Sequence, residues 1–166
     1  MHMKWVNVAR SLIGTKELPG PASNAKIMGW GNALGAKVLG IPYTADSIPW
    51  CGLFAAWCVH SAGLTPPKIA IRAAEWGKFG SPLSLTGTPP LGAIAVFIRK
   101  GGGHVGFVVG VHANGDLDIL GGNQGDEVYV RRFARARLTH LRWPPNTPMG
   151  QPAPTVKGTK ATTGEA

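Results

Sequence analysis

The first third of the chain carries apolar residues at helical spacing. The pattern predicts one helix that starts near Trp5 and ends at Gly14, and a second over residues 22–38 that glycines interrupt. A third helix is expected to begin at Pro49, which suits a first helical turn, and to end at Gly63. Its apolar face follows the helical repeat: Cys51, Phe54, Ala55, Cys58, Val59 and Ala62. A short helix around residues 69–76 follows, and then a connection rich in proline, glycine and serine.

From residue 91 the pattern changes to short apolar runs that glycine-rich turns separate. Residues 93–98, 104–111, 116–120 and 127–133 are predicted strands. Helices that come first and antiparallel strands that come second are typical of the α+β class. Residues 144–166 are rich in proline, glycine and threonine and offer almost nothing to bury, which predicts a disordered tail. The pattern thus indicates one domain over residues 1–143 and a tail after it.

The net charge of the chain favours an anionic partner but does not identify which kind. Seventeen Lys and Arg against eight Asp and Glu give a formal charge of +9, which favours an anionic partner such as nucleic acid, acidic lipid or a cell-wall polymer. Five arginines alternate with apolar residues near the C-terminal end of the domain. That alternation fits either the solvated face of a strand or a contact surface for an anionic polymer. These arginines are Arg131, Arg132, Arg135, Arg137 and Arg142.

The two cysteines lie on the third predicted helix but in different surroundings. Cys51 falls in the first turn, where unpaired N–H groups and the helix dipole favour the thiolate, and Asp46 or Ser47 could cap the helix. Cys58 lies two turns deeper without such help and is expected to fill the core. About 10 Å of helical rise separates the two, so both should be free thiols. Cys51 is therefore a candidate nucleophile, with a buried structural cysteine as the alternative.

A histidine on a predicted strand is a candidate base for the Cys51 thiol. His104 follows three glycines and opens an apolar strand, where another group can approach closely. His112 falls at the tip of the next hairpin, about 26 Å along the strand from His104, and is a poor rival for the same role. His60 and His140 are expected to be structural or solvated, and His140 to lie beyond the core strands.

The turn between the second and third strands sets which residues face His104. Asn114-Gly115 is a strong signal for a two-residue hairpin turn. That turn would pair residue 111 with 118 and His104 with residue 125, making Asn123 a diagonal neighbour on the same face, with Gln124 on the other. A one-residue bulge would spoil this pairing. Cys51, His104 and Asn123 then form the cysteine, histidine and carboxamide set of papain-like catalysis.

Three short segments together resemble a known family. "PWCGLFAAWCV", "GGHVGFVVG" and "LGGNQGDEV" are similar to segments of NlpC-type and CHAP-type cysteine amidohydrolases and peptidases that cut bacterial peptidoglycan, including a small-lysin branch of phages and prophages. The resemblance covers about residues 4–143 and implies a papain-like core with the nucleophile helix on an antiparallel sheet. It assigns Cys51 as nucleophile, His104 as base and Asn123 as third polar residue. Many CHAP-type domains carry an acid two positions before the Asn, where this chain has Gly121.

Three further residues are candidates for substrate contact. Asp46 could pair with an amine of a stem peptide or cap the helix. Glu17 resembles a groove-lining position of the small lysins, or is a surface charge. Trp50, next to the nucleophile, could form a wall of the cleft or pack in the core. The backbone N–H of Cys51 is expected to contribute to an oxyanion hole.

Other classes of protein fit the sequence less well. No HExxH or CxxC pattern supports a metal hydrolase, no phosphate-binding glycine loop occurs, and neither a metal nor another cofactor is expected. Signatures of nucleic-acid binding are missing, and no apolar run could span a bilayer. The expected partner is bacterial peptidoglycan, and the protein is expected to be a monomer.

The resemblance implies a peptidoglycan hydrolase that cleaves an amide bond of the stem peptide or the muramoyl–alanine linkage, as a phage or prophage endolysin. Two alternative functions remain. One is a secreted antibacterial amidase effector with an immunity protein, and the other is a catalytically silent wall-binding module. No secretory signal is recognised, so release by a holin or a secretion apparatus is expected to take the protein from the cytoplasm to the wall.

Overall fold

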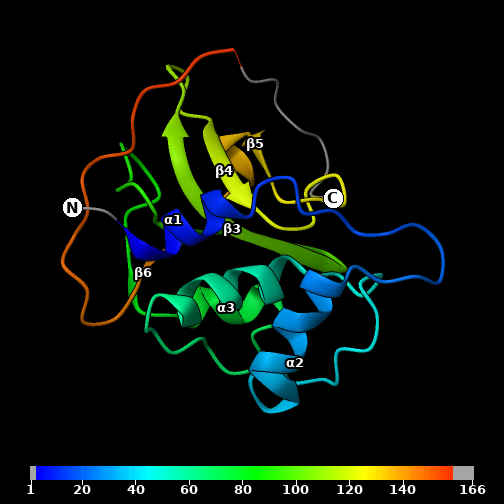
Figure 1. The fold of residues 1–166 in the computed structure, drawn as a ribbon. Coiled ribbons are helices and arrows are strands. Elements are labelled where there is room, and N and C mark those ends of the chain that lie inside the picture. Colours follow the sequence, from blue (N-terminus) through cyan, green and yellow to red (C-terminus); the bar gives the residue numbers. More distant parts are fainter. Residues whose placement is uncertain (1–2, 159–166) are drawn as a thin grey trace.

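The computed structural model describes residues 3–158, in which helices pack on one antiparallel sheet (Figure 1). The helical elements are α1 (Lys4–Ser11), α2 (Ala25–Leu39), α3 (Cys51–Ser61) and the short 3-10 helices η1 (Ala73–Lys78) and η2 (Arg135–Arg137). The strands are β1 (Ser81–Pro82), β2 (Ile94–Arg99), β3 (Gly102–Val111), β4 (Leu117–Gly121), β5 (Tyr129–Phe133) and β6 (His140–Trp143). They form one sheet in the order β1-β6-β2-β3-β4-β5. The predicted α+β class is confirmed.

The helix that carries both cysteines lies in the centre of the molecule. Most residues of α3 are buried, because α1, α2, β3 and β4 all pack against it (Figure 1). Such a helix is apolar nearly all round rather than on one face. Trp30 of α2 packs its ring against those of Phe54 and Trp57 of α3. The interruption predicted in α2 occurs at Gly35, whose φ of 80° is not helical.

The β3–β4 hairpin differs in register from the predicted pairing. Its turn has one residue more than expected, since His112 and Asp116 pair across it, and Val111 faces Leu117 rather than Asp118. A bulge between Val108 and Gly110 then shifts the pairing by another residue. The two-residue turn was therefore wrong, because Gly115 with φ of 95° closes a three-residue loop instead.

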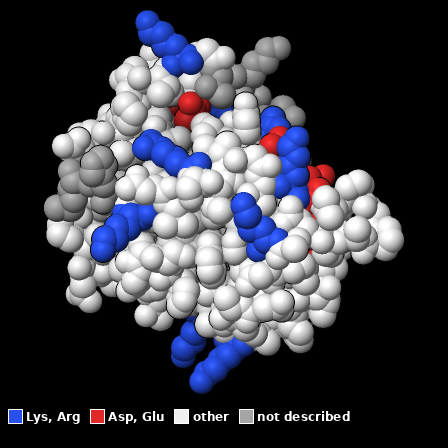
Figure 2. Space-filling view, viewed as in Figure 1, with Lys and Arg blue, Asp and Glu red and all other residues white. Residues whose placement is uncertain are grey.

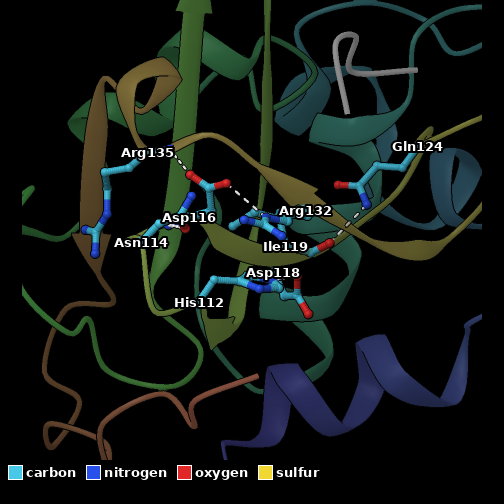
Figure 3. Close-up of polar contacts among 8 residues, drawn as sticks. All are labelled: His112, Asn114, Asp116, Asp118, Ile119, Gln124, Arg132 and Arg135. Atoms are coloured by element: carbon cyan, nitrogen blue, oxygen red, sulfur yellow. Dashed lines mark hydrogen bonds and ion pairs between the residues drawn. The ribbon is translucent and has the colours of Figure 1, made fainter. Parts of the chain in front are cut away.

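A polar network braces the tip of this hairpin (Figure 3). His112 Nε2 lies 2.7 Å from Asp118 Oδ1, and both residues are buried. Arg132 donates from Nε to Asp116 at 2.9 Å, which ties β5 to the turn. These contacts give His112 a structural partner distant from the cysteines, in agreement with its predicted place at the tip.

The sequence pattern did not predict β6 and β1, the two strands that extend the sheet beyond β2. His140 begins β6, which pairs with β2 on one side and with β1 on the other, so its expected place beyond the core strands was wrong. In β6, Leu141 and Trp143 are buried while the two residues between and before them are only partly so. Four residues are too few for this alternation to identify a strand.

The segment after Trp143 is ordered as far as the structure describes it, so the disordered tail was wrong for residues 144–158. It crosses the outside of the molecule and returns to the hairpin, drawn orange to red in Figure 1. Pro90 pairs with Pro152, and Val111 pairs with Thr155 in a parallel bridge. Proline suits an edge pairing of this kind because it needs no donor there. Residues 159–166 of the expected tail lie outside the described residues.

Two of the clustered arginines donate hydrogen bonds to backbone carbonyls of distant segments. Arg135 donates to the carbonyls of Gly115 and Leu85, and Arg142 donates to those of Phe79 and Gly80. Figure 2 shows the lysines and arginines of one face spread out rather than gathered in a patch. Within residues 3–158, no helix combines the length and apolar character that a membrane crossing requires.

Candidate active site

The helix start places Cys51 at the mouth of a cleft. Cys51 is the first residue of α3, and Trp50 before it provides no capping side-chain hydrogen bond. The cap predicted from Asp46 or Ser47 was therefore wrong. The first N–H groups of a helix have no acceptor within it, so they face the space in front of Cys51. This position combines a thiol with hydrogen-bond donors and the positive end of the helix dipole.

His104 is held on β3 by aromatic packing. It pairs with Phe97 of β2 and is 1% exposed. Its ring stacks on that of Phe133, with centroids 5.3 Å apart and planes 12° apart. The ring of Phe97 lies 6.3 Å away on a tilt and itself stacks on Phe133. The imidazole thus has little freedom to rotate.

Gln124 fixes the tautomer of the neutral His104 ring. Its Oε1 lies 2.7 Å from His104 Nε2. Its Nε2 donates to the carbonyl of Tyr129 at 2.7 Å and to that of Ile119 at 3.0 Å, the second of which is drawn in Figure 3. Because carbonyl oxygens only accept hydrogen bonds, these two contacts fix which end of the carboxamide is the NH₂ group. The oxygen end then faces His104 and requires Nε2–H, so Nδ1 of the neutral ring is the basic nitrogen.

The three residues predicted to form the site share one cleft. Cys51, His104 and Asn123 all line a cleft of about 500 Å³. Asn123 follows the end of β4 and has a left-handed φ of 57°, so the strand geometry stops before it. The chain then turns Gln124 inward, where it is 0% exposed. Gln124 is thus the site residue that the sequence reasoning missed, having assigned its side chain to the opposite face.

Two glycines at the end of β4 make this arrangement possible. A Cβ on Gly121 would collide with Oε1 of Gln124 and lie 3.1 Å from Nε2 of His104. A Cβ on Gly122 would lie 2.9 Å from the rings of Phe54 and Trp50, which brings β4 close to the start of α3. Gly121 is the position where many CHAP-type domains carry an acid. In this chain the carboxamide of Gln124 occupies the space that such a side chain would need.

None of the three candidates for substrate contact is among the residues that line this cleft. Asp46 is 1% exposed and accepts hydrogen bonds from the N–H groups of Leu18 and Asn24, so it anchors a loop. Trp50 is 0% exposed and donates from Nε1 to Glu17 at 3.0 Å. The structure thus gives Asp46 a loop-anchoring role and buries Trp50, with Glu17 as the half-buried acceptor of its hydrogen bond.

Glu17 makes stability depend on pH. Burial raises the pKa of its carboxyl above the usual value, the Trp50 hydrogen bond lowers it, and Asp126 and Asp46 raise it further. A raised carboxyl pKa means that the folded state holds the proton more tightly, so stability falls as pH rises above the ordinary Glu pKa of about 4.3. We expect Glu17→Gln to raise the melting temperature at pH 7 but not at pH 4. An equal difference at both pH values in a thermal scan would contradict this.

Cys58 serves the core, as predicted. It is a free thiol with no exposed surface, and burial raises its pKa well above the usual range. We expect Cys58→Ala to lower the free energy of unfolding by about 1–2 kcal/mol, because it opens a small cavity. Denaturant unfolding and the rate of substrate turnover, measured on the same protein, check this. A loss of turnover at unchanged stability would reverse the roles of the two thiols.

A cysteine at the start of a buried helix, a histidine on the adjoining strand and helices on one antiparallel sheet are the arrangement of papain-like folds. Residues 43–123 match the family model described as the CHAP domain. The match includes Cys51, His104 and Asn123 and ends directly before Gln124. Comparison with curated proteins and with solved structures gave no match.

Proposed function

We propose that the protein is a peptidoglycan hydrolase that cleaves an amide bond by cysteine catalysis. CHAP domains are generally peptidoglycan amidases and peptidases, which supports this class of substrate. The observation that carries the proposal is the contact of His104 Nε2 with Gln124, in a cleft that His104 shares with Cys51. It leaves Nδ1 as the nitrogen that can act on a thiol.

The chemistry proceeds in two halves. His104 Nδ1 takes the proton of the Cys51 thiol, and the sulfur attacks the carbonyl carbon of the scissile amide. The resulting oxyanion is stabilised by N–H groups at the start of α3. The protonated imidazole then gives its proton to the leaving nitrogen, so the amine departs and a thioester remains on Cys51. A water molecule, deprotonated by the same nitrogen, hydrolyses the thioester and restores the thiol.

Gln124 acts as a positioning residue in this mechanism. It holds the ring in the tautomer that leaves Nδ1 basic, and its oxygen stabilises the imidazolium that forms, as the third residue of a triad does. A neutral carboxamide does this without bringing a second buried charge beside the ring. Asn123 lines the cleft itself, so its place as the third residue stays a prediction that mutation can separate from the role of Gln124.

The bond that is cleaved lies either within the stem peptide or between muramic acid and its alanine. Mass spectrometry of the soluble products from purified sacculi distinguishes the two. Fragments in which glycan and peptide remain joined would exclude the amidase, and separated glycan chains and stem peptides would identify it. Sacculi that release no fragments at all would contradict the proposed hydrolase.

We further propose that the protein acts as a phage or prophage endolysin, with an antibacterial effector as the second candidate. A net charge of +9 supports action on an anionic wall in both cases. Production in the bacterial cytoplasm should then be harmless until a holin gives access to the wall. Purification from the producing cell with a tightly bound small protein that blocks the activity would favour the effector.

A further inference from the structure

Two arginines flank the candidate nucleophile and base. The cleft that holds Cys51 and His104 is lined in addition by Arg72 and Arg99. Both arginines are exposed. Among the residues that line this cleft in the described chain, none is acidic. The cleft therefore presents two guanidinium groups to a substrate beside the reacting atoms.

Arg72 is brought to the cleft by close packing against the start of α3. Gly52, next to Cys51, faces the backbone of Ala70 and Ile71 so closely that a Cβ there would collide with the carbonyl of Ile71 at 2.7 Å. Arg72 follows directly and forms the N-cap of η1. Its side chain is therefore tied to the segment that touches the first turn of the nucleophile helix.

Arg99 is brought to the cleft from the side of the histidine. It ends β2, two residues after Phe97, which is the direct partner of His104. Alternate residues of a strand point to one face, so Arg99 extends from the same face as His104 about 7 Å along the strand. Its partner across the strand pair is Gly102, which has no side chain.

We propose that Arg72 and Arg99 bind a free carboxylate of the substrate next to the scissile amide. This inference rests on the proposed function and specifies its substrate. Guanidinium groups bind carboxylates with paired, charge-assisted hydrogen bonds, and apolar neighbours such as Ile71 and Ala74 leave these charges as the main polar recognition elements. The substrate class is therefore a stem peptide with an unmodified carboxylate at this position rather than its carboxamide form.

The test compares two muramyl stem peptides that differ only in whether their side-branch α-carboxylates are free or amidated. Binding is measured by calorimetry on the Cys51→Ala protein, which should not turn the peptides over. We expect the free form to bind about 10-fold to 100-fold more tightly, as charge-assisted hydrogen bonds imply. Arg72→Gln and Arg99→Gln, each in that background, should weaken binding of the free form and leave binding of the amidated form unchanged.

A double variant of exposed residues on α1, Lys4→Gln with Arg10→Gln, controls for net charge and should bind both peptides as before. Equal affinity for the two peptides, or arginine variants that weaken both forms equally, would overturn the carboxylate site. If the protein digests sacculi in a Cys51-dependent way but binds the two peptides with equal affinity, this inference alone is overturned. Arginine-dependent binding of the free form by a protein that leaves sacculi intact would instead contradict the proposed hydrolase and retain the site.

Discussion

Replacement of Cys51 or of His104 by alanine should abolish the digestion of purified sacculi. Loss of a nucleophile or its base reduces turnover by about 10⁴-fold or more, because the remaining binding and oxyanion contacts act alone. Neither change removes a large part of the core, so both variants should stay folded. Release of soluble fragments from sacculi, measured beside the melting temperature, gives both quantities.

The matched control for Cys51→Ala is Cys58→Ala, which removes the other thiol from the same helix. We expect sacculus digestion by the control at nearly the wild-type rate at a temperature where it is folded. Digestion by Cys51→Ala at the wild-type rate would exclude thiol catalysis, whatever the control does.

Replacement of Gln124 by alanine should lower the turnover of a soluble substrate by about 10²-fold to 10⁴-fold, since a triad without its third residue loses the productive tautomer. It should also destabilise the fold, because the Ile119 carbonyl loses a donor in a buried contact at a cost of about 1–3 kcal/mol, and the part-buried contact with the Tyr129 carbonyl is lost as well. A purely structural role would not change the pH dependence of turnover. We therefore expect the pH profile to move in Gln124→Ala, measured well below its melting temperature.

Gly121 offers a rescue that separates positioning from folding. In wild type, a side chain at residue 121 collides with Gln124, so Gly121→Asp alone should reduce turnover. In the Gln124→Ala background the space is open, and the same Asp would lie beside His104 Nε2, where a Cβ is already within 3.1 Å. Partial recovery of turnover is expected. No recovery in a folded double variant, together with an unchanged pH profile in Gln124→Ala, would contradict the assignment of Gln124.

The sequence was sufficient for the class of fold because long apolar patterns determine it. The helices at residues 4–11, 25–39 and 51–61 and the strands of the hairpin follow periodic runs that a whole element supports. The short strand β6 and the segment up to residue 158 were missed, because their order comes from contacts with distant residues such as Pro90 and Val111. Propensity along the chain does not record such contacts.

The sequence placed Asn123 in the cleft with His104 but assigned Gln124 to the wrong face, and the register of the β3–β4 hairpin explains both results. A longer turn and a bulge each shift the β3–β4 pairing by one residue, so Phe107 faces Leu120, two residues from the expected partner. An even shift preserves the face of a strand, which is why Asn123 still lies in the cleft with His104. The left-handed turn at Asn123 then reverses the expectation for Gln124. Neither a bulge nor a left-handed asparagine leaves a clear mark in one sequence.

The alkylation rate of Cys51 across pH, followed by intact-protein and peptide mass spectrometry, tests most directly whether the three segments form one catalytic centre. In wild type, Cys51 is expected to react rapidly at pH 6, as a thiolate paired with His104, while buried Cys58 stays unmodified. His104→Ala should slow that reaction at pH 6 by about 10-fold or more and leave an ordinary thiol behind. Identical pH curves for Cys51 in wild type and His104→Ala would contradict the account.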